Sequence, residues 1–321
     1  MPKQIQKIKI YIGVLTLGII WGSTWLAIKF GLDDAPPFFA AALRFILAFL
    51  ILFVWQKIKG YKFPRGIKYW SNTTFIALLM FIIPYTAVYW SEQYIPSGLS
   101  AVVLSFQSLF VVIFAHFISK NEKAGILKIV GLFIGLIGLF LIYKSQINWD
   151  KIRGFAGMSV LFLAAASAAL GLVLLSKQKR KIEPVPEVMT HLGITAVAFI
   201  LMTLFFEKPS VNIFTEKLWI SIIYLAVPGT AFGFIVYYWI AKHATAFVTS
   251  FSIFISPVFA VFLGWLVLNE NINLLGIIGV LLVLISIFVS QFKKKIHLNS
   301  SKKKYTKIKN YKIFNQYKKS V

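Results

Sequence analysis

The chain has 321 residues, of which 59% are hydrophobic and 14% are charged, and its mean hydropathy is +0.79. This composition is too apolar for an ordinary water-soluble domain and indicates an integral membrane protein. The net charge is +24, but no recognised nucleic-acid-reading motif accompanies it, so nucleic acid is not an expected partner; the absence of cysteine excludes disulfides and thiolate metal sites.

Long apolar windows separated by short polar breaks run along the chain, and about 20 apolar residues are enough for a helix to cross a bilayer. Their continuity favours helices over barrel strands, which alternate apolar and polar residues. The first window is too long for a secretory signal and should be retained. The windows cover residues 9–31, 38–57, 71–91, 97–119, 124–143, 154–176, 186–206, 217–241, 245–268 and 274–292. The expected fold class is an all-α integral membrane protein with ten transmembrane helices.

Basic residues gather on one side of this topology. With the N-terminus inside, the two chain ends and the loops after every second helix carry most of the 34 Lys and Arg residues. Loops rich in Lys and Arg stay in the cytoplasm, so segment 1–8 and the basic tail 293–321 are predicted to be cytoplasmic. We interpret the tail as a topology signal; binding of anionic lipid headgroups is the alternative.

The two halves of the sequence resemble each other. A shift of 149 residues places Tyr89-Trp90 on Tyr238-Trp239, and a shift of 148 places Asn121-Glu122 on Asn269-Glu270. The predicted repeats are 9–143 and 154–292, each with five helices. Because five is odd, the second repeat must cross the membrane in the opposite direction, which is the inverted arrangement of many transporters.

Four motifs resemble the EamA-type family of the drug/metabolite transporter superfamily. They are "WGSTWLAIK" from Trp21, "RFILA" from Arg44, "YWSEQYIPSGLSAVVLS" from Tyr89 and "ISPVFAVFLGWLVLNE" from Ile255. The resemblance implies ten helices, cytoplasmic termini and export of small organic metabolites. The sequence departs from the family at Ser108, where the first half often has a proline like Pro257, so a kink in the fourth helix is in doubt.

Two cations, Lys29 and Arg44, fall inside predicted helices. A charge at the centre of a membrane helix costs at least about 2.5–3.5 kcal/mol unless it pairs, snorkels or faces water. Both lie toward the predicted outer side, where they would either meet an anionic substrate group or form structural ion pairs with Asp33, Asp34 or Glu92. Ion pairs that act as an outer gate would combine the two roles.

Aromatic and hydroxyl-bearing residues form the second set of candidates for the substrate pathway, since such walls suit an amphipathic compound. Packing or contact with lipid is the alternative for each one. Together with Lys29, Arg44 and Glu92, the latter expected at the outer mouth, the candidates are Trp21, Thr24, Tyr85, Tyr89, Trp90, Ser105, Gln107, Tyr237, Trp239, Ser252 and Ser256.

Prolines and glycines suggest mechanical roles. Pro84, Pro228 and Pro257 lie inside predicted helices and are candidates for hinges or for static bends. Gly131, Gly135 and Gly138 form a small-residue face that suits close packing, either within the chain or in a homodimer.

Glu122 and Glu270 are interpreted as structural residues at helix starts. His116 and His191 are more consistent with packing than with a proton relay.

The predicted function is secondary transport of a small organic metabolite, amino acid-like or amphipathic, across the cytoplasmic membrane, by alternating access between the repeats. No Walker motif is present, so direct use of ATP is not expected. A membrane-embedded enzyme acting on a lipid-like substrate is the alternative, but no cluster of acids, histidines or nucleophiles at membrane depth supports it. No catalytic residue, metal or cofactor is predicted; the expected partners are the substrate, the bilayer and, in one interpretation of the glycine face, a second copy of the chain.

Overall fold

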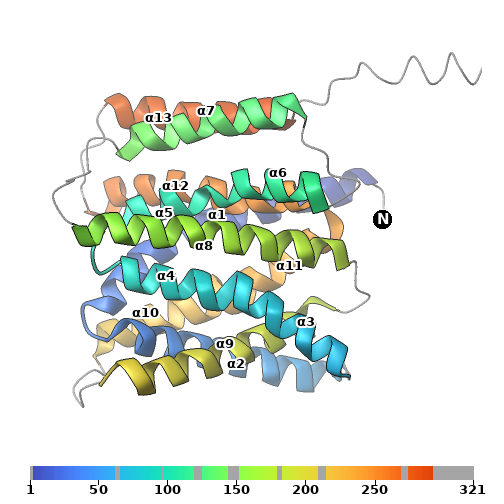
Figure 1. Ribbon diagram of the computed structural model, residues 1–321, viewed down its shortest axis with the longest axis vertical. Helices are drawn as coiled ribbons and strands as arrows, with labels where there is room; N and C mark the ends of the chain where they lie inside the picture. The colour runs from blue at the N-terminus through green and yellow to red at the C-terminus, as the bar shows by residue number, and fades with distance from the viewer. Residues whose placement is uncertain are drawn as a thin grey trace, which may run out of the picture.

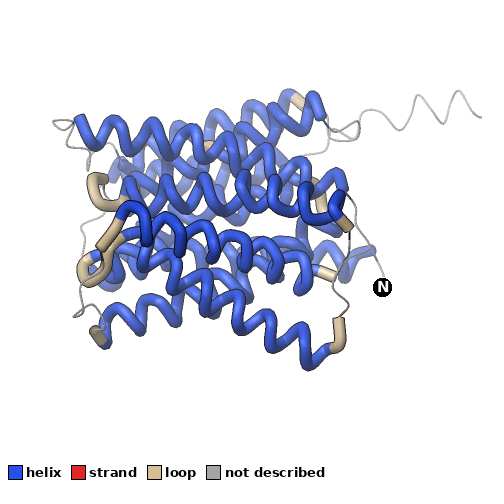
Figure 2. The backbone as a smooth tube through the Cα atoms, turned by 60° about the horizontal axis from the view of Figure 1, so that its bottom comes forward, coloured by secondary structure: helices blue, strands red, loops and turns tan. Residues whose placement is uncertain are grey.

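The computed structural model describes residues 3–61, 66–95, 97–118, 125–143, 152–178, 183–208, 215–268 and 274–291, which form ten helical rods and contain no strand (Figure 1, Figure 2). The first five rods are α1 (Lys3–Leu32), α2 (Pro37–Lys59), α3 (Ile67–Ala77) with η1 (Leu78–Ile82) and α4 (Ile83–Ser91), α5 (Ser97–Ser105) with α6 (Gln107–Ile118), and α7 (Ile126–Tyr143). The second five are α8 (Ile152–Gln178), α9 (Pro184–Phe206), α10 (Glu216–Ala226) with η2 (Val227–Phe232) and α11 (Gly233–His243), α12 (Ala246–Leu268), and α13 (Leu274–Gln291). The prediction of ten helices is confirmed.

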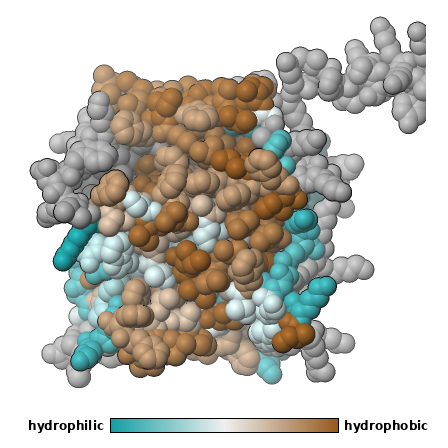
Figure 3. Space-filling model, viewed as in Figure 1, coloured by the Kyte–Doolittle hydropathy of each residue, from teal (hydrophilic) through white to brown (hydrophobic). Residues whose placement is uncertain are grey.

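The rods have the length and surface of membrane spans. Seven of them are long and apolar enough to cross a bilayer, and the other three, α7, α12 and α13, have 18, 23 and 18 residues. Figure 3 shows hydrophobic residues over the middle of the rods and hydrophilic residues gathered at their two ends. Large apolar side chains such as Leu163 and Phe205 are 69% and 78% exposed, as expected for side chains that face lipid.

Some of the sequence predictions fall on residues that the structure does not describe. Glu122, Glu270 and the tail lie outside the described residues. From Lys3 onward the N-terminal segment continues α1 rather than preceding it, since its Lys and Gln residues are good helix formers.

Helices of one half pack against helices of the other half. In Figure 1, α7 and α13 form a pair at one end of the molecule and α2 and α9 form a pair at the opposite end. Between them α1 packs against α12, and α8 packs against α4, α5 and α6. The core of the molecule is therefore an interface between the two halves.

Glycines permit the closest of these contacts. A Cβ atom on Gly22 of α1 would lie 2.8 Å from the backbone oxygen of Ser256 in α12, and one on Gly138 of α7 would lie 2.6 Å from the backbone oxygen of Gly279 in α13. Gly135, on the same helix as Gly138, faces Phe254 and Ser286. The predicted glycine face thus packs within the chain, at least through Gly135 and Gly138.

Two rods contain a π-helical segment at matching positions. The segments η1 and η2 begin at Leu78 and Val227, which are 149 residues apart, the shift that aligns the two halves. Pro84 follows η1 closely and Pro228 lies inside η2. A proline removes one backbone donor, and the wider π turn accommodates its ring, so both interruptions have the same local cause.

Carbonyl groups of these segments accept hydrogen bonds from the opposite half. Trp21 Nε1 in α1 donates to the Gly229 carbonyl of η2 at 3.0 Å, and Ser167 Oγ in α8 donates to the Leu79 carbonyl of η1 at 3.0 Å. The first helix of each half therefore holds the π segment of the other, as a two-fold related pair would.

The fourth rod is interrupted although it lacks the family's proline. Its helix breaks at Phe106, between α5 and α6, and the hydroxyl of Ser108 donates to the Ser250 carbonyl in α12 at 3.0 Å. The helix around Pro257, by contrast, continues through α12 without a break. The fourth membrane helix is therefore interrupted even though Ser108 replaces the proline.

Candidate functional site

A cavity lies between the two halves, near the middle of the long rods. Its walls come from α1, α2, η1, α4, α5 and α6 of the first half and from α8, α11 and α12 of the second. Residues predicted from the sequence that line it are Trp21, Thr24, Arg44, Pro84, Tyr85, Gln107, Tyr237 and Ser256. Residues that line it and were missed are Trp25, Ile28, Met80, Val88, Leu104, Ala168, Phe234 and Ile253.

The wall formed by α1 shows what sequence reasoning missed. Trp21, Thr24, Trp25 and Ile28 are spaced by three, four and seven residues, which places them on one face of a helix. Trp25 Nε1 donates to Ser256 Oγ across the cavity at 3.2 Å, so this wall is tied to α12. The helical period, applied from Trp21, would have identified Trp25 and Ile28.

Arg44 of α2 brings a positive charge into this largely apolar cavity, where it is 1% exposed. Its Nε donates to Thr230 Oγ1 of η2 at 2.7 Å, and its Nη2 makes a long contact of 3.4 Å with the Tyr85 hydroxyl. The guanidinium carbon lies 4.8 Å from the centre of the Tyr85 ring, in cation–π geometry. Nη1 is buried and makes no hydrogen bond of good geometry, although the Tyr89 hydroxyl also interacts with Arg44.

The π segment explains how Arg44 is held. Thr230 donates its hydroxyl proton to the Leu225 carbonyl, five residues earlier, at 2.7 Å, and its oxygen is thereby oriented to accept from Arg44. Each buried hydrogen bond to a charged group contributes about 1.5–3 kcal/mol. The distortion around Pro228 thus supplies the neutral partner of a buried cation.

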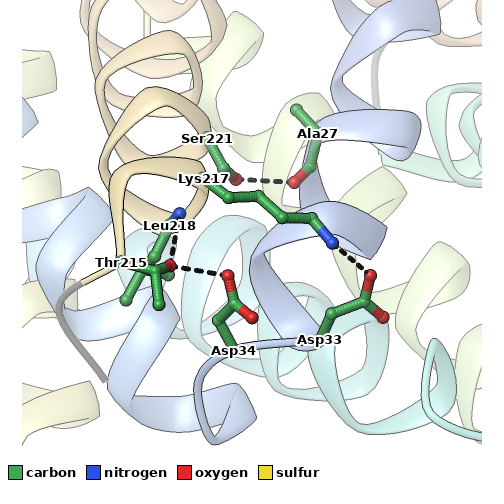
Figure 4. Close-up of polar contacts among 7 residues, drawn as sticks. All are labelled: Ala27, Asp33, Asp34, Thr215, Lys217, Leu218 and Ser221. Carbon is green, nitrogen blue, oxygen red and sulfur yellow. Dashed lines mark hydrogen bonds and ion pairs between the residues drawn. The ribbon is translucent and has the colours of Figure 1, made fainter. Parts of the chain in front are cut away.

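The acidic residues near this end of the bundle have other partners. Figure 4 shows the Asp33 carboxylate paired with Lys217 Nζ at 2.7 Å and the Asp34 carboxylate accepting from Thr215 Oγ1 at 2.6 Å. In the part of the chain that the structure describes, no carboxylate pairs with Arg44. The proposed ion pairs of Arg44 with Asp33, Asp34 or Glu92 are therefore not formed.

Lys29 and Glu92 meet, but not as a side-chain ion pair. Lys29 Nζ donates to the backbone oxygen of Glu92 at 3.2 Å, and Lys29 is exposed. The Glu92 carboxyl is buried just beyond the end of α4, where Ser97 Oγ donates to Oε2 at 2.6 Å and Oε1 has no partner. Burial raises the pKa of Glu92 to about 7, against the smaller opposing effects of Ser97, Ser100 and Lys29.

The other predicted pathway residues do not line the cavity. Tyr89 is buried and interacts electrostatically with Arg44, and Trp90 packs against the ring of Tyr94. The Trp239 ring packs against His243 in a tilted arrangement. Ser105 and Ser252 donate to carbonyls of their own helices, Val102 and Thr249, respectively.

The histidines of the described residues also lie outside the cavity wall. His191 in α9 is fully buried, with Nδ1 2.6 Å from the Glu187 carbonyl and 3.4 Å from the Tyr238 hydroxyl. His116 packs against Phe117 near the end of α6. Among the described residues, no three His, Asp or Glu side chains are arranged to hold a metal ion.

Part of the cavity wall is aromatic. Tyr237 of α11 lies 5.1 Å from Trp21 and 6.1 Å from Phe234, measured between ring centres. Its hydroxyl is buried beside Gln107 of α6 and has no hydrogen-bond partner of good geometry. The site therefore combines aromatic faces, a few polar groups and one cation, which suits an amphipathic small molecule.

Comparison with known proteins places the sequence among transporters. The model of the EamA-like transporter family matches residues 8–144 and 155–292. The chain is 31% identical to the "Uncharacterized transporter YoaV" of Bacillus subtilis, over 89% of this chain and 97% of that protein. It is 26% identical to the "Uncharacterized inner membrane transporter YedA" of Escherichia coli, over 88% of this chain and 92% of that protein.

A solved crystal structure shares the fold. It is 16% identical in sequence, has a TM-score of 0.74, and the match covers 88% of this chain and 96% of the other. The match to both halves agrees with a fold of ten helices built as two repeats, and the family consists of transporters rather than enzymes. The chain is thus a multi-pass membrane protein and belongs to the EamA-like transporter family of the drug/metabolite transporter superfamily.

Proposed function

We propose that this protein is a secondary transporter that exports a small organic metabolite across the cytoplasmic membrane by alternating access between its two inverted repeats. The observation that carries the proposal is the cavity itself, which lies between the repeats and takes wall residues from both. Repeats that rock about a site at their interface open it to one side and then the other.

The π segments supply candidate hinges. Backbone hydrogen bonds are already altered at η1 and η2, close to Pro84 and Pro228, so bending there disrupts fewer helical bonds than bending elsewhere. Pro257, which lies in an uninterrupted part of α12, is the weaker candidate. The hydrogen bonds from Trp21 and Ser167 would then have to shift between the two states.

Orientation and oligomeric state complete the proposal. We expect both termini to be cytoplasmic because the basic loops share their side, and ten crossings return the chain to the side where it began. Gly135 and Gly138 pack against other helices of the same chain, so they do not argue for a homodimer. The homodimer stays a prediction.

Transport is tested in vesicles that contain the purified protein and are loaded with a mixed pool of amino acids and other metabolites. Release of at least one compound faster than from protein-free vesicles is expected. If no compound crosses faster under any imposed ion gradient, secondary transport is refuted.

Alternating access is tested by thiol labelling, for which the absence of native cysteine provides a clean background. Ala168→Cys places a thiol in the cavity wall, and Ala169→Cys places one at a neighbouring position that is fully buried outside it. A membrane-impermeant reagent should reach position 168 from either side and position 169 from neither. Labelling of position 168 from one side only, whatever compound is added, would contradict alternating access.

A further inference from the structure

We propose that Arg44 binds the carboxylate of the transported compound, and that the substrate class is an organic monocarboxylate with an apolar or aromatic body. The inference rests on the proposed function, because it takes the central cavity as the place where the transported compound binds. It goes further in assigning a charge and a binding residue to that compound.

The hydrogen bonds of Arg44 leave one part of the guanidinium unused. Nε is held by Thr230 and Nη2 contacts Tyr85, while the buried Tyr89 hydroxyl also interacts with Arg44 and Nη1 makes no hydrogen bond of good geometry. An arginine stays protonated in proteins, and its planar end matches the two oxygens of a carboxylate. Nη1 is therefore the nitrogen that has a donor left for a carboxylate oxygen.

The charge is not balanced by the protein. In the described part of the chain, the nearby carboxylates of Asp33, Asp34 and Glu207 are engaged by Lys217, by Thr215 and by the backbone amides of Phe38 and Phe39. Among the described residues that line the cavity, none is Asp or Glu. A buried cation without a charged partner destabilises the protein, and a bound anion offsets that cost.

The other residues of the cavity wall favour an anion whose uncharged part is apolar or aromatic. Trp21, Trp25 and Phe234 offer aromatic faces, and Ile28, Val88 and Ile253 are aliphatic. The same wall has no carboxylate to pair with an ammonium group, so a carboxylic acid without an amino group fits it better than the matching amino acid. Tyr237 and Gln107 would orient a further polar group if one is present.

The test compares three probes that share one skeleton: 3-phenylpropionate, its amide, and L-phenylalanine. Binding to the purified protein is followed by isothermal titration calorimetry, and quenching of the intrinsic tryptophan fluorescence, to which Trp21 and Trp25 of the cavity wall contribute, serves as a second readout. We expect 3-phenylpropionate to bind at least tenfold more tightly than either the amide or L-phenylalanine. Equal binding of acid and amide by the unmodified protein, or no binding of the acid, would overturn the proposal without any variant.

Variants then locate the binding group. Arg44→Gln should reduce the affinity for 3-phenylpropionate to that of the amide, while Arg44→Lys should retain part of the preference. Lys217→Gln removes an equal charge outside the cavity and should leave the preference unchanged. Thermal unfolding of each variant checks that it is folded.

The outcomes separate this inference from the proposed function. Vesicles that transport the amide or L-phenylalanine as fast as the acid, and equally well with Arg44→Gln, would refute the carboxylate site and leave transport standing. Vesicles that transport no compound would refute transport itself.

Discussion

Charged residues have different surroundings in the interior of the bundle and at the turn between α1 and α2. At the turn, Lys217 and Asp33 form an ion pair 2.7 Å long, and their side chains are 47% and 52% exposed (Figure 4). In the interior, Arg44 is 1% exposed and has hydroxyl and aromatic neighbours instead of a carboxylate. Exposed ion pairs contribute little to stability, whereas an unbalanced buried charge opposes folding. A charge kept at such a position is better explained by binding than by folding.

Glu92 extends this contrast, because it is a buried acid whose pKa is raised to about 7 from 4.5. The folded state therefore holds its proton more tightly than the unfolded state, and the proton's stabilising effect is complete below pH 4.5. This effect disappears as the pH rises through 7, so the free energy of unfolding should fall by about 3 kcal/mol between pH 4.5 and pH values above 7. Thermal unfolding between pH 4 and 8 measures this, and Glu92→Gln should remove most of the slope.

The control is Glu216→Gln, which changes an exposed carboxyl at the start of α10. Because this side chain is exposed, the control shows what the loss of one carboxyl group in itself does to unfolding. A slope that survives in Glu92→Gln would show that another group causes it.

Thr230→Val tests how much the hydrogen bond to the buried Arg44 contributes to stability. The variant removes the only hydroxyl that accepts from Arg44 Nε in the described structure and leaves a charged donor buried without a partner. We expect a loss of about 2 kcal/mol in the free energy of unfolding, read from thermal or denaturant unfolding in detergent.

Thr249→Val is the matched control, since the Thr249 hydroxyl in α12 bonds only to the Thr245 carbonyl of its own helix. Its effect should be clearly smaller. Equal effects of the two variants would mean that the hydrogen bond between Thr230 and Arg44 adds no more to the free energy of unfolding than a hydroxyl bonded within its own helix.

The smallest effect is expected at the turn. Lys217→Gln breaks the exposed ion pair with Asp33, but water and salt already screen both charges. The midpoint of thermal unfolding should stay within experimental error in 0.15 M salt, about physiological ionic strength. A marked drop would place the turn, rather than the interior, among the stabilising parts of the fold.

Sequence patterns predicted the rods well because hydropathy reports directly on lipid contact. They did not predict η1 and η2, since the hydrogen-bond register inside a helix leaves no trace in hydropathy, although Pro84 and Pro228 marked the right places. The α1 wall could have been extended from Trp21 to Trp25 by helical period.

Other parts of the site were beyond the reach of the sequence. Phe234 and Ile253 have side chains typical of any apolar core, so only the packed structure shows that they face a cavity. The sequence also suggested acids as partners for Arg44, whereas the nearest polar partner is Thr230, 186 residues away in the chain. Pairings of that kind depend on how helices rotate and pack.

Arg44→Met provides the most direct comparison of folding with function, because it removes the charge and keeps an unbranched apolar side chain. If the charge serves substrate binding, the midpoint of thermal unfolding should stay the same or rise, while transport of 3-phenylpropionate into vesicles falls about 100-fold, the scale of losing one buried charged pair. A lower unfolding midpoint with unchanged transport would contradict this, and would make Arg44 a structural residue.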